Sequence, residues 1–61
     1  MNGWTPCTLD AVPVGGAFMF HPEDQLVYTV IKKADGVALC KDDFVNKFSH
    51  CATDARVWVE V

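Results

Sequence analysis

The chain has 61 residues, 51% of them hydrophobic and 21% charged, and its formal net charge at pH 7 is −3. This length leaves room for one small domain, and the composition excludes a disordered tail. The negative charge disfavours a duplex-binding protein, which needs a basic face, and no apolar stretch approaches the roughly 20 residues of a membrane-spanning helix.

The amino-terminal residues and the cysteines favour a cytoplasmic protein. Residues 1–6 contain no basic region followed by an apolar one, so we expect no secretion signal. The cysteine count is odd, with Cys7, Cys40 and Cys51, which is simplest to explain by free thiols in a reducing compartment. We therefore expect a cytoplasmic location and no association with membranes.

The first predicted elements are a turn and two strands. Residues 9–16 contain Pro13 and two adjacent glycines, which disfavour a helix or a central strand and predict a lead-in turn. Residues 17–21 follow as a strand, and residues 22–25 have the composition of a turn. The β-branched and aromatic run at residues 26–31 predicts the next strand.

An Asp-Gly pair between two apolar runs, within residues 34–36, is the strongest local signal and predicts a tight hairpin. We favour a three-residue loop, with Gly36 in the left-handed region. This loop pairs Lys33 with Val37, Val30 with Cys40 and Tyr28 with Asp42. The alternative is a two-residue loop of Asp35 and Gly36, which shifts the register by one and pairs Ile31 with Cys40.

The last third of the chain is predicted to be extended, with one ambiguous segment. In residues 42–49 the two phenylalanines are four apart, which suits one helical turn or one face of a strand, and the length favours a strand. Residues 53–55 predict a tight turn or a short 3₁₀ segment. Residues 56–61 alternate cleanly, with the valines on one face and Trp58 on the other.

These short strands predict an all-β fold, a small barrel of five strands with at most one short 3₁₀ or helical turn. Closure into a barrel is the economical way for so short a chain to remove exposed sheet edges. Residues 9–61 are assigned to this domain and residues 1–8 to an amino-terminal extension. The predicted core comprises Leu9, Val12, Phe18, Phe20, Tyr28, Val30, Cys40, Phe48, Val57 and Val59.

The core and turn positions follow a defined order along the chain. It runs from Leu9-x-x-Val12-Pro13-Val14-Gly15-x-x-Phe18-x-Phe20, through Tyr28-x-Val30, Cys40 and Phe48-Ser49, to Thr53-x-x-x-Val57-x-Val59. This order resembles that of small SH3-like barrel proteins of unknown function encoded by bacteriophages and prophages, over residues 9–61. The resemblance implies a five-stranded barrel and a viral origin, and it carries no catalytic or binding residue that can be transferred.

The residues capable of metal or acyl-transfer chemistry are poorly spaced for either. Cys7, His21, Cys40, His50 and Cys51 are Zn²⁺ ligand types without a Cys-x-x-Cys knuckle, and adjacent residues in an extended segment point to opposite faces. Acyl transfer by Cys51 or Cys7, with His50 or His21 as the base, needs an oxyanion site and a pocket, for which so small a core leaves little room. We expect no catalytic site, no metal and no cofactor.

The central hairpin is predicted to be apolar on both faces. Once its core residues point inward, further apolar side chains remain outside beside a rim of lysines, and such a patch marks a contact surface. Trp58 is either a second anchor, of the type enriched at interfaces, or a cap on an open barrel end. Two arrangements would hide the patch: the first eight residues folded over it, or the other hairpin register. The predicted interaction surface comprises Val27, Ile31, Val37, Leu39, Trp58, Lys32 and Lys33.

The sequence therefore predicts a non-enzymatic interaction module, a phage-type accessory or regulatory protein of the host cytoplasm that binds a protein partner or itself. The alternative is a single-stranded nucleic-acid binder that uses Lys32, Lys33, Lys41 and Lys47, with Tyr28 or Trp58 for stacking. A further alternative is a minor structural component of a virion.

Overall fold

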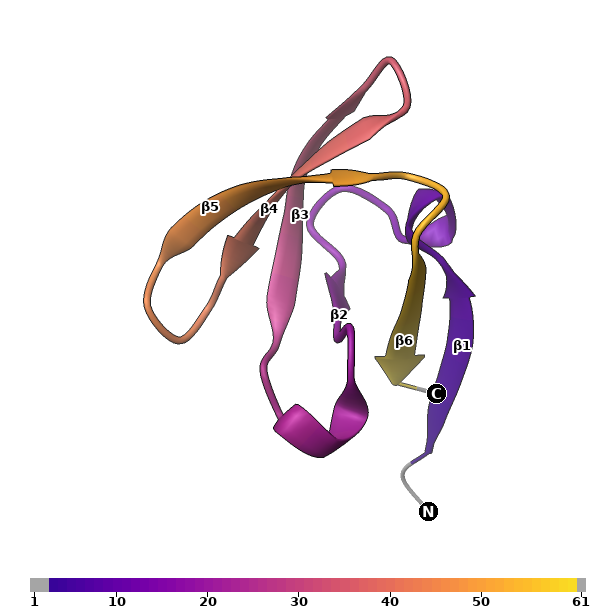
Figure 1. Cartoon of the computed structure of the whole chain (residues 1–61), viewed down its shortest axis with the longest axis vertical. Coiled ribbons are helices and arrows are strands. Elements are labelled where there is room, and N and C mark those ends of the chain that lie inside the picture. The colour runs from indigo at the N-terminus through magenta and orange to yellow at the C-terminus, as the bar shows by residue number, and fades with distance from the viewer. Residues whose placement is uncertain (1–2, 61) are drawn as a thin grey trace.

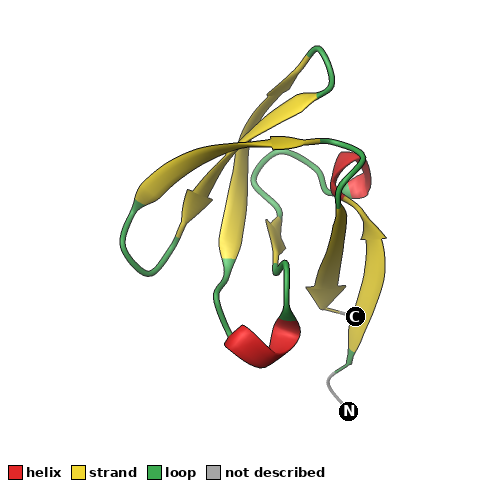
Figure 2. Cartoon of the chain, in the orientation of Figure 1, coloured by secondary structure: helices red, strands yellow, loops and turns green. Residues whose placement is uncertain are grey.

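A computed structural model of the chain describes residues 3–60, which form short β-strands and two single-turn 3₁₀ helices (Figure 1, Figure 2). The strands are β1 (Trp4–Thr8), β2 (Ala17–Phe18), β3 (Tyr28–Ala34), β4 (Val37–Asp42), β5 (Lys47–Ala52) and β6 (Arg56–Glu60). The 3₁₀ helices are η1 (Leu9–Ala11) and η2 (Pro22–Asp24). The predicted all-β class is confirmed.

The strands form two antiparallel sheets, one ordered β1-β6 and the other β2-β3-β4-β5. An isolated bridge joins the sheets, because Met19 and Trp58 each donate a backbone N–H to the other's carbonyl, at 2.8 and 2.7 Å. Within the described residues the sheets stay open and contain six strands. The closed barrel of five strands that the sequence predicted is therefore not confirmed, and no strand of residues 3–60 lies against the outer side of β5.

Strand β1 occupies the segment that the sequence analysis assigned to an extension. It pairs along its whole length with β6, from Trp4 opposite Glu60 to Thr8 opposite Arg56. Pro6 lies in the middle of β1 and has no N–H to donate, which an edge strand tolerates and a central strand does not. Residues 4–8 thus belong to the fold.

The central hairpin has a two-residue loop, so the three-residue loop favoured from the sequence is wrong. Asp35 and Gly36 have φ angles of 54° and 76°, the left-handed values that a tight hairpin needs at both loop positions. Ala34 therefore lies opposite Val37, and Lys33 lies opposite the next residue of β4.

A β-bulge in β3 restores the register further along the hairpin. The pairing shifts by one between Val30 and Lys32, which leaves Ile31 as the additional residue of the bulge. As a result Val30 faces Cys40, as the sequence predicted, and Tyr28 faces Asp42.

The ambiguous segment at residues 42–49 is a turn followed by a strand. β4 ends at Asp42, residues 43–46 form the turn, and β5 begins at Lys47. Asp42 organises the turn, because its Oδ1 accepts the N–H of Phe44 at 2.7 Å and its carbonyl accepts the N–H of Asn46 at 2.8 Å. Asn46 has a φ of 58°, a left-handed value that asparagine tolerates well.

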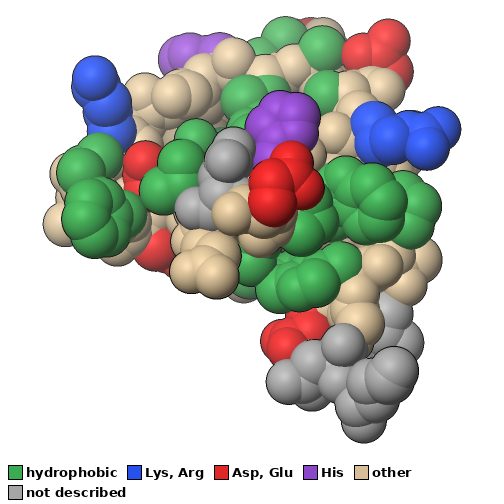
Figure 3. Space-filling view, turned by 60° about the horizontal axis from the view of Figure 1, so that its bottom comes forward, with side chains coloured by type: hydrophobic (Ala, Val, Ile, Leu, Met, Phe, Trp, Pro, Cys, Tyr) green, Lys and Arg blue, Asp and Glu red, His purple; other side chains and the backbone are tan. Residues whose placement is uncertain are grey.

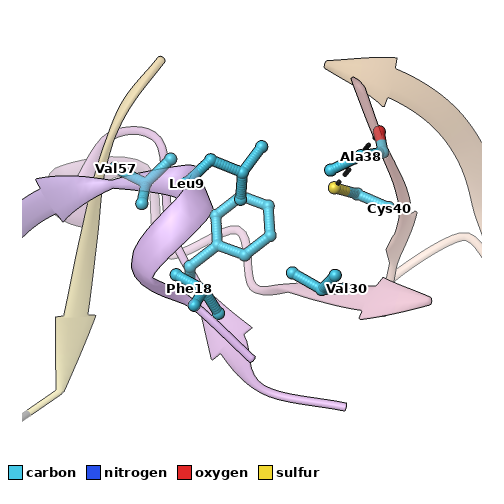
Figure 4. Packing of buried hydrophobic residues seen from close by; sticks show 7 residues of the cluster. Leu9, Phe18, Val30, Ala38, Cys40 and Val57 are labelled. Atoms are coloured by element: carbon cyan, nitrogen blue, oxygen red, sulfur yellow. Dashed lines mark hydrogen bonds between the residues drawn. The ribbon is translucent and has the colours of Figure 1, made fainter. Parts of the chain in front are cut away.

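The core lies between the two sheets (Figure 4). Leu9 and Phe18 lie at its centre, with Val57 of β6 on one side and Val30 of β3 on the other. Its buried residues are Leu9, Val12, Phe18, Met19, Val30, Ala38, Cys40 and Val57, and Phe20, Tyr28 and Val59 pack against it while partly buried.

The prediction that Phe48 is a core residue is wrong, since its side chain is 57% exposed. Phe48 lies opposite Lys41, on the side of the sheet that faces away from the core. Met19 and Ala38, which the sequence analysis left out of the core, are buried instead.

Candidate interaction surface

The sheet formed by β3, β4 and β5 has one face toward the core and one face away from it. Along β4, Ala38 and Cys40 are buried, and since strand side chains alternate, Val37, Leu39 and Lys41 lie on the opposite side. The register places the neighbouring side chains of β3 and β5 on the same side. We call this side the outer face: Lys32, Ala34, Val37, Leu39, Lys41, Phe48, His50 and Ala52.

A hollow of about 250 Å³ lies on the outer face, lined by Lys32, Ala34, Val37, Leu39 and His50. Leu39 is on the middle strand, with Lys32 opposite it on β3 and His50 opposite it on β5. The hollow therefore has an apolar centre between an ammonium group on one side and an imidazole on the other.

The positive charges of the outer face are not neutralised nearby. Among the side chains that the structure describes, no carboxylate lies within ion-pairing distance of Lys32 or Lys41. Asp43 lies at one end of this face, and its carboxylate accepts a hydrogen bond from the Thr29 hydroxyl, which lies 3.1 Å from Oδ1 and 3.0 Å from Oδ2. The outer face thus carries positive charge in a chain whose net charge is −3.

Part of the predicted interaction surface comes together at the hollow. Lys32, Val37 and Leu39 line it, and Ile31 is 39% exposed at the adjoining bulge. Val27 is half-buried just before β3, and its carbonyl accepts the N–H of Asp43 at a distance of 3.0 Å. β1 pairs with β6 in the other sheet, so residues 4–8 do not cover this surface in the way that one alternative required.

Two predicted surface residues lie elsewhere. The ammonium of Lys33 donates to the carbonyls of Asp10 and Val12 at 2.9 and 2.7 Å, which ties β3 to the loop around η1. Trp58 is half-buried on β6, where its backbone forms the bridge to Met19. Neither side chain lines the hollow.

Sequence reasoning missed an exposed apolar group at the end of the β4–β5 hairpin. Phe44, Val45 and Phe48 are 81%, 55% and 57% exposed, and we call these three residues the hairpin tip. Hydrophobic side chains protrude at the left end of Figure 3, the side on which this hairpin lies in Figure 1. Asp42 and Asn46, both turn-forming residues, were the signal that could have placed a loop here.

His50 was also absent from the predicted surface. Its position beside Leu39 depends on the β4–β5 register. Alternation from Phe48 would have placed it on the same face as that phenylalanine.

In the described part of the chain, no three His, Cys, Asp or Glu side chains are grouped to hold a metal ion. Cys40 is buried, and its Sγ donates a weak hydrogen bond to the Ala38 carbonyl at 3.9 Å (Figure 4). Burial, and secondarily the neighbouring Cys51 thiol, raises the pKa of Cys40 to about 11. Cys40 is therefore a protonated core residue at neutral pH.

Within residues 3–60, no helix has the length and apolar character to cross a bilayer. No protein-family model, curated protein or solved structure matches this chain.

Proposed function

We propose that this chain is a small non-enzymatic interaction module that binds a protein partner through its outer face. The observation that carries the proposal is the hollow around Leu39, an apolar depression with Lys32 and His50 on its two sides. Exposed apolar surface rimmed by polar groups is typical of contact sites.

The charges of the outer face define the chemistry of the partner. An apolar side chain fits against Val37 and Leu39, and an adjacent carboxylate fits beside Lys32 or His50. Electrostatic complementarity of this kind selects among partners and orients them. The favoured partner is a protein segment that carries an aspartate or glutamate next to an aliphatic or aromatic residue.

The biological setting of the proposal follows the resemblance to phage-encoded SH3-like barrel proteins. On that ground the module is an accessory or regulatory protein that acts in the host cytoplasm. A virion component is the alternative setting, and it predicts co-purification of the chain with viral particles.

The proposal is tested by selecting short random peptides from a displayed library on the immobilised protein. We expect enrichment of acidic residues next to apolar ones. A synthetic peptide of the enriched sequence is then titrated against wild type and Lys32→Glu, which we expect to weaken binding by about tenfold or more.

Lys47→Glu is the matched control, because Lys47 lies outside the hollow and alternates to the side of β5 opposite Phe48. This variant should bind the peptide like wild type. No enrichment over an unrelated immobilised protein, or equal losses in the two variants, would contradict the proposal.

A single-stranded nucleic-acid binder is the second candidate, because Lys32, Lys41 and the exposed ring of Phe48 share the outer face. Its support is weaker, since Lys33 is engaged by backbone carbonyls. In addition, Tyr28 stacks against Phe18 with ring centroids 5.6 Å apart, so its ring already has a stacking partner within the chain. Titration with single-stranded oligonucleotides at low and moderate salt separates the candidates, because only this one predicts binding that salt weakens steeply.

A further inference from the structure

The outward edge of β5 is a feature that the proposed function does not use. β5 is the last strand of its four-stranded sheet, and residues 3–60 place no strand against its outer side. Almost all of its residues are exposed. An edge of this kind presents unpaired backbone N–H and C=O groups to a further strand.

The backbone groups that point outward can be identified from the pairing. The N–H of Thr53 donates to the carbonyl of Gly36 at 3.0 Å, which continues the register of β4 and β5 by one residue. Hydrogen-bonded and non-bonded pairs alternate in an antiparallel ladder. The backbone groups of Phe48 and His50 and the N–H of Ala52 therefore face the open edge, while the carbonyl of Ala52 accepts the N–H of Ala55 at 3.1 Å.

This edge lacks the usual protection against strand pairing. Proteins commonly place proline, a bulge or several charges on an edge strand. β1, the outer strand of the other sheet, has Pro6 in its middle. β5 pairs with β4 in regular register, has no proline, and carries one lysine, at its first position.

We infer that β5 pairs in antiparallel fashion with β5 of a second copy of this chain, around a two-fold axis at His50. In this register Phe48 of each copy lies opposite Ala52 of the other copy. Both backbone groups of His50, the carbonyl of Phe48 and the N–H of Ala52 then take part in the new ladder, which joins the two sheets into one.

The charges around β5 fit a second copy. Antiparallel pairing places Lys47 of one copy at the far end of β5 of the other, close to the turn that contains the exposed Asp54. The two copies of Lys47 lie at opposite ends of the paired strands, so like charges stay apart. Opposite charges meet at both ends of the interface.

The hairpin tip supplies apolar area beside the paired strands. Phe44 and Phe48 together leave roughly 300 Å² of aromatic surface exposed in each copy, on the usual areas of aromatic side chains. A specific interface needs about 600 Å² or more from each copy. The tip and the six-residue edge together reach the lower end of this range, so we expect a dimer with a dissociation constant in the micromolar range.

Sedimentation equilibrium of the full chain between about 1 µM and about 1 mM tests the inference. The mass should rise from that of a monomer to that of a dimer. Phe48→Glu and Ala52→Pro should each weaken dimerisation about tenfold or more, because the first removes apolar surface and the second removes an outward N–H. Circular dichroism checks that both variants remain folded.

Val14→Glu is the matched control, since it introduces the same charge at an apolar residue that is 60% exposed and lies outside β5. It should dimerise like wild type. Amide exchange gives a second readout: the N–H groups of His50 and Ala52 should exchange more slowly as the concentration rises. A monomer mass over the whole range, or dimerisation that neither edge variant weakens, overturns the inference.

Discussion

Val30 and Cys40 lie opposite each other on β3 and β4, and both side chains are fully buried. They form one wall of a cluster that also contains Phe18 and, from the other sheet, Val57. Because a single cluster spans both sheets, the two sheets depend on each other for stability.

Phe18→Ala should unfold the protein or nearly so. The ring is fully buried, and its removal is expected to cost about 3 to 5 kcal/mol, while a domain of this size has only about 3 to 9 kcal/mol of stability. Urea unfolding followed by circular dichroism measures the loss. Phe44→Ala, at a ring that is 81% exposed, is the control and should change stability by no more than about 0.5 kcal/mol.

The stability of the protein should fall between pH 9 and pH 11 because of Cys40. The pKa of this thiol is raised from 9.0 to about 11 by burial first and Cys51 second. Between these values the native state keeps a proton that the unfolded chain has lost, so the contribution present below pH 9 disappears as the pH rises through 11. The loss is of the order of 2 to 3 kcal/mol.

Urea unfolding of wild type and Cys40→Ala across this pH range measures that contribution. The variant lacks the thiol and should show a flatter dependence on pH, since other groups titrate in both proteins. Parallel curves for the two proteins would show that Cys40 does not couple folding to protonation.

Gly36→Ala should destabilise the hairpin loop by about 1 to 2 kcal/mol, because Gly36 has a φ of 76° and residues with a β-carbon are strained there. Nothing lies within 4 Å of the added methyl group, so the expected cost is purely conformational. Gly3→Ala, where the methyl group also meets nothing within 4 Å, is the control. Thermal unfolding should separate the two variants; an equal melting temperature would contradict the assigned loop.

Adjacent lysines should differ in their effect on stability. Lys33→Met removes the hydrogen bonds from the ammonium to the carbonyls of Asp10 and Val12, and we expect a loss of about 1 kcal/mol, given the partial exposure of the group. Lys32→Met, at an exposed side chain, should be within about 0.5 kcal/mol of wild type. Urea unfolding of both variants checks the difference, and the reverse order would contradict the assigned roles.

The sequence was sufficient for the all-β class, the hairpin and most of the core. Period-two alternation and the Asp-Gly pair are local signals that tertiary contacts did not override. The bulge at Ile31 has no such signal, and the predicted pairing of Val30 with Cys40 came from a loop that was one residue too long, an error that the bulge offset.

The remaining misses depend on contacts between distant segments. The face on which Phe48 lies follows from the length of the turn after Asp42, which composition does not determine. The strand around Pro6 becomes evident only when β6 lies beside it. Lys32, Val37 and Leu39 lie on one local hairpin, so the sequence was enough to place them on the surface. His50 joins them only through the pairing of β4 with β5.

Pro6 sets a limit on the size of any assembly that this chain forms by joining sheets. Once two copies have paired through β5, the outermost strands of the complex are the two copies of β1, each interrupted by a residue that cannot donate to a ladder. Growth by strand addition then has no free end within residues 3–60. The geometry favours a finite, symmetric pair over an open-ended fibre.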